Sequence, residues 1–130
     1  MKGSVLIKIT FESGLCIKCR ITTHENPKIA EALLLSLPFE SETKRWGDEV
    51  YFSVPFSAQP EKLQEVVDVG SVAYWPEEPS LCLFFGPTPS SPSAEVIKPY
   101  SPVGVIGKVV GDPKILKNVK DGERVRVERG

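Results

Sequence analysis

The sequence predicts a mainly β protein in which seven or eight short strands close, or nearly close, into a barrel capped by a helix. Short apolar runs that alternate with polar residues recur along the chain, and each is typical of a half-buried strand. One stretch instead has the spacing of an amphipathic helix. The 130 residues fit a single domain, residues 1–130, that is large enough to bury a core without a metal or a disulfide.

Seven runs have the alternation or the β-branched and aromatic content of strands. The first two runs are joined by the turn Glu12-Ser13-Gly14 and are expected to pair as a hairpin, and the turn Asp121-Gly122 precedes the last run. The predicted strands span residues 4–11, 15–21, 47–54, 70–75, 81–85, 103–110 and 123–128. Short helical segments are predicted at residues 61–66 and 113–117.

The predicted α-helix spans residues 27–36. Asn26 is expected to cap its first turn, and Pro27 fits the first helical position because the N–H that proline lacks has no partner there. Apolar residues follow at helical spacing on one face, and Pro38 ends the run. We therefore expect this helix to lay an apolar stripe against a sheet.

The strand at residues 47–54 separates two kinds of side chain, because successive residues of a strand point to opposite faces. One face is apolar and is expected to be core, whereas the other is polar and aromatic, as in a binding cleft on the outside of a sheet. Glu49 shares this outer face with Tyr51 and is the best candidate for an acid, a base or a polar anchor. An ordinary exposed carboxylate is the alternative. The core face holds Val50, Phe52 and Val54, and the outer face holds Glu49, Tyr51 and Ser53.

The segment VGSVAYWPEEPSLCLFFGPTP contains two short aromatic strands joined by a proline turn. Adjacent strand residues face opposite ways, so we expect Phe84 in the core and Phe85 in a pocket. Trp75, which precedes a proline at a strand end, is also expected in the pocket, with core packing of the cluster as the alternative. We interpret the proline-rich stretch 86–102 as an ordered loop bordering the cleft, with Thr88 at its rim. A disordered linker is the alternative.

Charge and composition exclude several classes of protein. The 16 basic and 17 acidic residues leave a net charge of −1, which argues against a general nucleic-acid binder. No stretch is long and apolar enough to span a membrane, and charges interrupt the first residues where a signal peptide would be apolar. The three cysteines are an odd number, which fits reduced thiols. We therefore expect a cytoplasmic protein that contacts neither nucleic acid nor membrane.

Cysteine and histidine offer little support for catalysis or metal binding. Cys16 and Cys19 form a CxxC pair, but positions three apart on a strand point to opposite faces, so packed thiols are expected. A zinc site would also need Cys82 and His24, and a hydrolase triad would need His24 as its base. No nucleotide-binding fingerprint is present. We expect no cofactor and no metal.

Three segments in order resemble cyclophilins: NPKIAEALLLSLP, LCLFFGPTP and VIGKVVGDPKILKNVKDGERVRVE. The blocks WGDEVYFSVP, GSVAYWP and LCLFFGPTP are more closely similar to a small cyclophilin-like family of bacteria and archaea that has no established activity. The resemblance covers residues 4–128. It implies a closed eight-stranded β-barrel related in fold to the cyclophilin peptidyl-prolyl isomerases, with one capping α-helix and a short C-terminal helix.

The resemblance to the isomerases is partial at the residues that matter for catalysis. It implies that Phe85 falls on the phenylalanine that lines the proline pocket and that Trp75 falls near a small residue of the same cleft. Phe52 falls where the catalytic arginine is expected, and Val103 falls where the pocket histidine is expected. An approach of Arg45 from the start of the strand is the alternative source of a guanidinium. Efficient isomerase activity is not expected.

These observations predict a protein that binds a small molecule or a short peptide in an aromatic cleft. A weak or altered prolyl isomerase is one alternative, and a hydrolase-associated subunit that uses Glu49 is another. A homodimer through an edge strand is a further alternative. The predicted walls, floor and rim of the cleft are formed by Glu49, Tyr51, Ser53, Trp75, Phe85 and Thr88.

Overall fold

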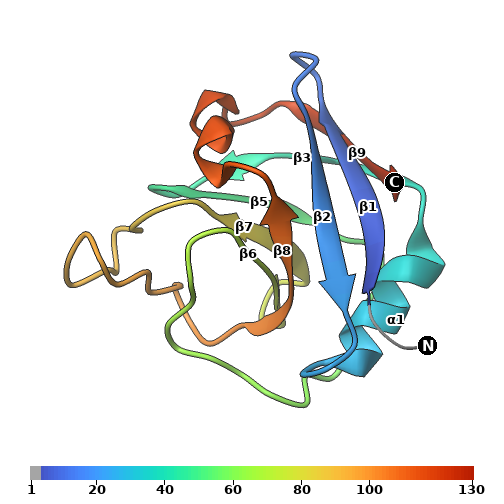
Figure 1. Ribbon diagram of the computed structural model, residues 1–130, viewed down its shortest axis with the longest axis horizontal. Coiled ribbons are helices and arrows are strands. Elements are labelled where there is room, and N and C mark those ends of the chain that lie inside the picture. Colours follow the sequence, from blue (N-terminus) through green and yellow to red (C-terminus); the bar gives the residue numbers. More distant parts are fainter. Residues whose placement is uncertain (1–3) are drawn as a thin grey trace.

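Alternating apolar residues build nine strands in the computed structural model, which describes residues 4–130 (Figure 1). The first three residues of the predicted domain lie outside the described residues. The strands are β1 (Ser4–Phe11), β2 (Cys16–Thr22), β3 (Phe39–Glu42), β4 (Lys44–Arg45), β5 (Glu49–Ser53), β6 (Ser71–Trp75), β7 (Ser80–Phe84), β8 (Gly104–Val110) and β9 (Arg124–Arg129). The helices are α1 (Pro27–Ser36) and the 3-10 helix η1 (Pro113–Asn118).

The strands form one antiparallel sheet in the order β3-β9-β1-β2-β8-β6-β7-β5-β4, which curls into a nearly closed barrel (Figure 1). Its two edge strands, β3 and β4, are consecutive in the chain and are separated only by Thr43. The buried Thr43 hydroxyl donates to the Lys120 carbonyl at 2.7 Å and accepts from the Glu123 N–H at 2.9 Å. β3 also lies against β5. The chain itself therefore joins the two edges of the sheet at this corner.

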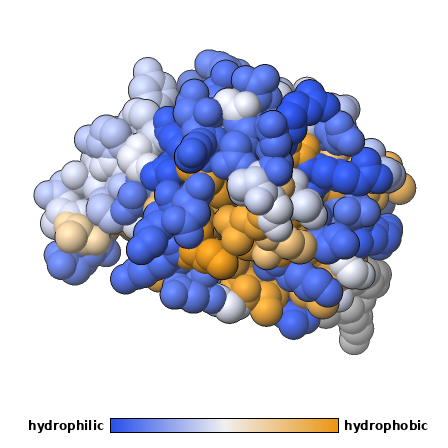
Figure 2. All heavy atoms as spheres, turned by 90° about the horizontal axis from the view of Figure 1, so that it is seen from above, coloured by the Kyte–Doolittle hydropathy of each residue, from blue (hydrophilic) through white to orange (hydrophobic). Residues whose placement is uncertain are grey.

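Packing inside the barrel involves the inward-facing residues of the strands and one face of α1. The helix contributes the buried side chains of Ile29, Ala30 and Leu33, and η1 contributes Leu116. The two helices lie at opposite ends of the barrel (Figure 1). Seen from above, the surface is mostly hydrophilic, with hydrophobic residues gathered near the middle of the view (Figure 2). Within residues 4–130, no helix is long and apolar enough to cross a membrane.

The sequence-based prediction of a mainly β barrel with a capping helix is confirmed, but two details differ. The strand count is nine rather than eight, because residues 39–45 form β3 and β4. The prediction of a helical turn at residues 61–66 is wrong. Gln64 forms an isolated bridge with Val103, with hydrogen bonds of 2.8 and 3.0 Å in the two directions, and this pairing keeps the backbone extended.

Asn26 occupies the position before α1, as expected, but its side chain makes no capping hydrogen bond. Its Nδ2 donates to the carbonyls of Lys62 and Val105, each at 3.0 Å, and its Oδ1 accepts from the N–H groups of Glu61 and Lys62, each at 2.9 Å. The residue is fully buried. Asn26 therefore fastens the loop before β6 to the start of the helix and to β8.

We expect Asn26→Ala to lower the free energy of unfolding by about 3 kcal/mol, because the substitution leaves four backbone groups without their partner in a buried site. Urea denaturation followed by circular dichroism measures the loss. Asn118→Ala is the control, since Asn118 is exposed and its Nδ2 donates to the Ile115 carbonyl at 3.3 Å. A loss no larger than that of the control would contradict the structural role of Asn26.

Candidate functional site

A cavity of about 370 Å³ lies on the outer face of the sheet, where β5, β6 and β7 run side by side. Each of these strands sends alternate residues into the barrel, and the remaining residues face the cavity side. The loop between β7 and β8 forms the opposite wall. The residues that line the cavity are Trp46, Glu49, Tyr51, Trp75, Glu77, Glu78, Cys82, Tyr100, Ser101 and Val103.

Small residues sit opposite one another on neighbouring strands of this face, and one of them, Cys82, lines the cavity. Tyr51 pairs with Cys82, and Cys82 pairs in turn with Ala73, so one cross-strand row changes from a large side chain to two small ones. A second cluster of buried apolar residues covers the rest of this face, outside the barrel core. Its members are Val67, Ala73, Cys82, Phe84, Ile97 and Val103.

Four aromatic rings surround the cavity in an edge-to-face series. The centroid distances are 5.8 Å between Trp46 and Tyr100, 5.9 Å between Tyr100 and Trp75, and 6.1 Å between Trp75 and Tyr51. The indole N–H of Trp75 also donates to the Ser101 hydroxyl at 2.6 Å. These contacts connect the loop between β7 and β8 to the turn before β5 and to the end of β6.

A tight turn between β4 and β5 brings Trp46 beside Glu49. The Trp46 N–H donates to the Glu49 carbonyl at 3.0 Å, and Gly47 inside the turn has a φ of +60°. A Cβ at Gly47 would also lie 2.7 Å from Cδ of Pro89, so glycine is required both by conformation and by the approach of the loop. This turn places an indole and a carboxyl group at the same end of the cavity.

Glu49 is buried, with 5% of its surface exposed. Burial raises the pKa of its carboxyl group to about 7, although a hydrogen bond from the Cys82 thiol acts in the opposite direction. Burial and the adjacent Glu49 charge raise the pKa of Cys82 well above its usual range, so this thiol keeps its proton. Burial, Glu49 and Glu78 likewise raise the pKa of Tyr51. The carboxyl group therefore titrates near neutral pH and has the properties of an acid, a base or an anchor for a polar ligand.

The structure brings three of the six predicted site residues together, namely Glu49, Tyr51 and Trp75. The alternative that Glu49 is an ordinary exposed carboxylate is wrong. Ser53 is exposed and lines a shallow hollow beyond the far end of β5. Thr88 is buried, and its hydroxyl donates to the Lys98 carbonyl inside the loop rather than facing the cavity.

Phe84 and Phe85 face opposite sides of the sheet, as expected. The side predicted for each residue is wrong, because the positions of the two are reversed. Phe85 packs in the barrel core, whereas Phe84 packs in the second cluster outside the barrel. Leu81 and Leu83 have the same parity as Phe85 along the chain and also point inward. This run of alternate apolar residues was the signal in the sequence that places Phe85 inside.

The residues that the resemblance places at catalytic positions supply no guanidinium or imidazole to the cavity. Phe52 is buried in the barrel core, and Val103 lines the cavity with an apolar side chain. Arg45 donates to the carbonyls of Val119 at 2.7 Å, Gly47 at 3.1 Å and Lys117 at 3.2 Å, and its guanidinium lies 5.1 Å from the centroid of Phe85. The guanidinium of Arg45 is thus engaged by backbone carbonyls, and Arg45 is not among the residues that line the cavity.

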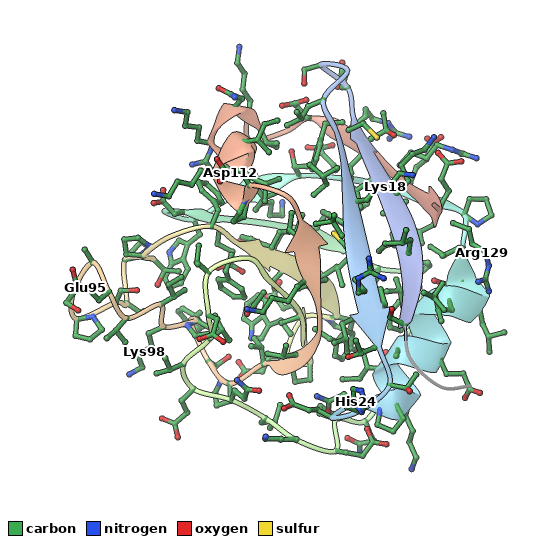
Figure 3. The ribbon with its side chains drawn as sticks, in the orientation of Figure 1. Lys18, His24, Glu95, Lys98, Asp112 and Arg129 are labelled. Atoms are coloured by element: carbon green, nitrogen blue, oxygen red, sulfur yellow. The ribbon has the colours of Figure 1, made fainter. Side chains whose placement is uncertain are left out.

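The cysteines and the histidine are dispersed. Cys16 is exposed and Cys19 is buried, so the two point to opposite faces of β2, and burial raises the pKa of Cys19 to about 12. His24 lies near the start of α1, far from the long loop that carries Glu95 (Figure 3), and it lines a different hollow. Among residues 4–130, no three histidine, cysteine or acidic side chains are grouped to hold a metal ion.

Trp46 and Tyr100 are the aromatic residues of the cavity that the sequence analysis missed. Trp46 precedes a glycine turn and the alternating strand β5, which is a local signal for a residue at a strand end. Tyr100 lies in the proline-rich loop, where no periodicity indicates which way a side chain points. The loop borders the cleft, as interpreted from the sequence, through Tyr100, Ser101 and Val103.

Comparisons with known proteins agree with the barrel. A family model described as cyclophilin-like matches residues 5–128. The solution structure of a hypothetical protein from Archaeoglobus fulgidus is similar to this chain, with a TM-score of 0.83 and 36% sequence identity. The match covers 100% of this chain and 98% of the archaeal one. No curated protein matches the chain.

We expect the stability of the protein to fall as pH rises from about 4.5 to above 7, because of Glu49. Folded Glu49 keeps its proton up to a pKa of about 7, whereas the unfolded residue loses it near 4.5, so the folded state binds the extra proton in this window. The resulting loss is up to about 3 kcal/mol. Glu49→Gln carries no charge and is expected to remove this contribution.

Urea denaturation of both proteins at pH 5 and at pH 8 tests this prediction. The difference between the two pH values should be smaller in Glu49→Gln than in the unmodified protein. Glu65→Gln, which changes an exposed glutamate outside the cavity, should leave the pH dependence as it is. Equal pH dependence in the unmodified protein and in Glu49→Gln would show that Glu49 ionises in the folded protein as it does in the unfolded chain.

Proposed function

This chain belongs to the cyclophilin-like family, and we propose that it binds a small molecule or a short peptide in the aromatic cavity between β5, β6, β7 and the long loop. The observation that carries the proposal is the convergence of four aromatic rings on one buried carboxyl group. Aromatic side chains supply apolar contact area at little conformational cost, and a single buried polar group fixes orientation. This combination is typical of ligand sites.

The size of the cavity supports a small ligand or part of a larger one. Ligand pockets enclose about 300–1,000 Å³, and the cavity here is near the lower end of that range, at about 370 Å³. It fits a compact organic molecule, or one side chain of a short peptide whose remaining residues lie across the rim. Glu77 and Glu78, in the turn between β6 and β7, form part of that rim.

The lining of the cavity argues against efficient prolyl isomerisation. The barrier to rotation about a peptide bond is about 18–20 kcal/mol, and a catalyst must bind the twisted state more tightly than the planar one. A donor to the prolyl nitrogen would provide that difference. The ten residues that line the cavity include no arginine, lysine or histidine, and the Arg45 guanidinium is engaged by three backbone carbonyls.

The raised pKa of Glu49 favours one second candidate function. A carboxyl group with a pKa of about 7 is suited to give or take a proton at neutral pH. In this case Glu49 would act on the bound ligand, in this chain alone or as part of a hydrolase-associated subunit. Turnover that is lost in Glu49→Gln while the ligand still binds would identify this function.

The binding proposal is tested by screening small fragments and short peptides against the isotope-labelled protein by NMR. Ligands should shift the indole N–H signals of Trp46 and Trp75 and the backbone signals of Glu49 and Cys82. Trp75→Leu should weaken binding by about tenfold, because it removes one ring of the cavity. Ser53→Ala is the control, since Ser53 lies outside the cavity. The proposal fails if no compound shifts these signals, or if Trp75→Leu leaves every affinity unchanged.

A separate measurement addresses the isomerase alternative. An Ala-Pro peptide at high concentration is followed by NMR exchange spectroscopy with and without a small amount of the protein. We expect the same rate of cis/trans exchange in both samples, because no donor faces the cavity to assist rotation of the prolyl bond. Faster exchange in the presence of the protein would contradict this expectation and restore the isomerase alternative.

A further inference from the structure

The cavity has a strongly one-sided charge. Its lining includes Glu49, Glu77 and Glu78 and no basic residue, although basic and acidic residues are nearly balanced over the whole chain. Asp121 adds to the negative potential felt by the Tyr51 hydroxyl. Lys98, on the same loop as Tyr100, points away from the barrel (Figure 3). A cavity lined by charges of one sign concentrates ligands of the opposite sign.

Glu49 is the most deeply placed of these charges, and the described residues provide it with no cation. Within residues 4–130, no lysine, arginine or histidine forms an ion pair with Glu49. Its neighbour Cys82 offers a weak thiol donor and no compensating charge. A buried carboxylate without a cation is destabilised by the loss of hydration. A positively charged ligand would provide the partner that the chain does not.

The aromatic rings are suited to the same kind of ligand. A cation within about 6 Å of a ring centroid is attracted by the negative face of the ring, and tryptophan and tyrosine attract it well. The four rings follow one another at centroid distances of 5.8 to 6.1 Å. All four rings line the same cavity as Glu49, so a small cation inside it lies beside aromatic rings as well as beside the carboxylate.

We propose that the cavity recognises an ammonium group, which is surrounded by Trp46, Tyr51, Trp75 and Tyr100 and paired with the carboxylate of Glu49. The inference rests on the proposed function, because it specifies the chemistry of a ligand in the same cavity. Both a small organic amine and a lysine side chain of a short peptide present this group. The cavity volume of about 370 Å³ suits such a head group with a short attached chain.

The test compares choline with its neutral analogue, in which carbon replaces the quaternary nitrogen. The two probes have the same shape and differ in charge. NMR titrations that follow the indole signals of Trp46 and Trp75 are expected to show that choline binds about tenfold more tightly than the neutral analogue. Glu49→Gln should remove most of this preference, and Glu65→Gln, outside the cavity, should preserve it.

Tyr100→Leu is a second variant that keeps the test valid if Glu49→Gln does not fold. Tyr100 is 68% exposed, so its replacement leaves the core intact, and leucine keeps apolar contact while removing the ring. The preference for choline should decrease by a few-fold in this variant. Acetylated tripeptides that carry lysine or norleucine between two alanines distinguish the sources: a preference for the lysine peptide over both choline and the norleucine peptide indicates a peptide ligand.

The outcomes separate this inference from the proposed function. If the neutral analogue or a carboxylate such as benzoate binds the cavity as tightly as choline, the inference is wrong and the binding function stands. If choline keeps its full preference in Glu49→Gln, the carboxylate is not the partner and the inference is overturned. If neither these probes nor any compound of the screen shifts the cavity signals, both the inference and the binding function fail.

Discussion

Packing of the loop between β7 and β8 against the outer face of the sheet is the interaction on which the site depends. Ile97 and Val103 of this loop pack with Phe84 and Ala73, so that every residue of β7 is buried. Backbone hydrogen bonds reinforce the contact, including the bond of 3.0 Å from the Val67 N–H to the Ile97 carbonyl. Without this cover the outer face of β5 would be open to water, and Glu49 would be an ordinary surface carboxylate.

The fold follows from the sequence wherever the information is local. Alternation in β1, β2, β5 and β9 fixes which residues face the barrel, and proline and apolar spacing fix the bounds of α1. β3 and β4 cannot be predicted from local alternation because they are short and mostly polar. They adopt the strand conformation because they pair with neighbouring strands, as Glu40 does with Arg126 and Lys44 with Tyr51. Asn26 shows the same limit, because its four partners lie 35 or more residues away along the chain.

The residues of the site also differ in whether local sequence or long-range contacts determine their position. Glu49 and Tyr51 follow from the phase of one strand, which a reader of the sequence can assign from Val50 and Phe52. Phe85 was misplaced because the phase of β7 was assigned from the aromatic pair instead of from the leucines before it. Tyr100 belongs to a loop whose course is set by contacts with distant strands, and no local pattern contains that information. A sequence thus predicts the strand wall of such a cavity better than its loop wall.

The barrel fold does not by itself determine the chemistry of a cavity built on it. The residues that the resemblance assigns to the catalytic arginine and the proline pocket, Phe52 and Phe85, are turned into the barrel core, whereas the cavity on the outer face has an acidic lining. The sign of the charge that lines a cavity decides which class of ligand is concentrated there. A carboxyl group with a pKa of about 7 is only partly ionised at neutral pH. A cation that binds beside it lowers this pKa and so increases its negative charge. The acidic lining without a basic residue is thus the physical basis for the proposal that the cavity receives a positively charged group.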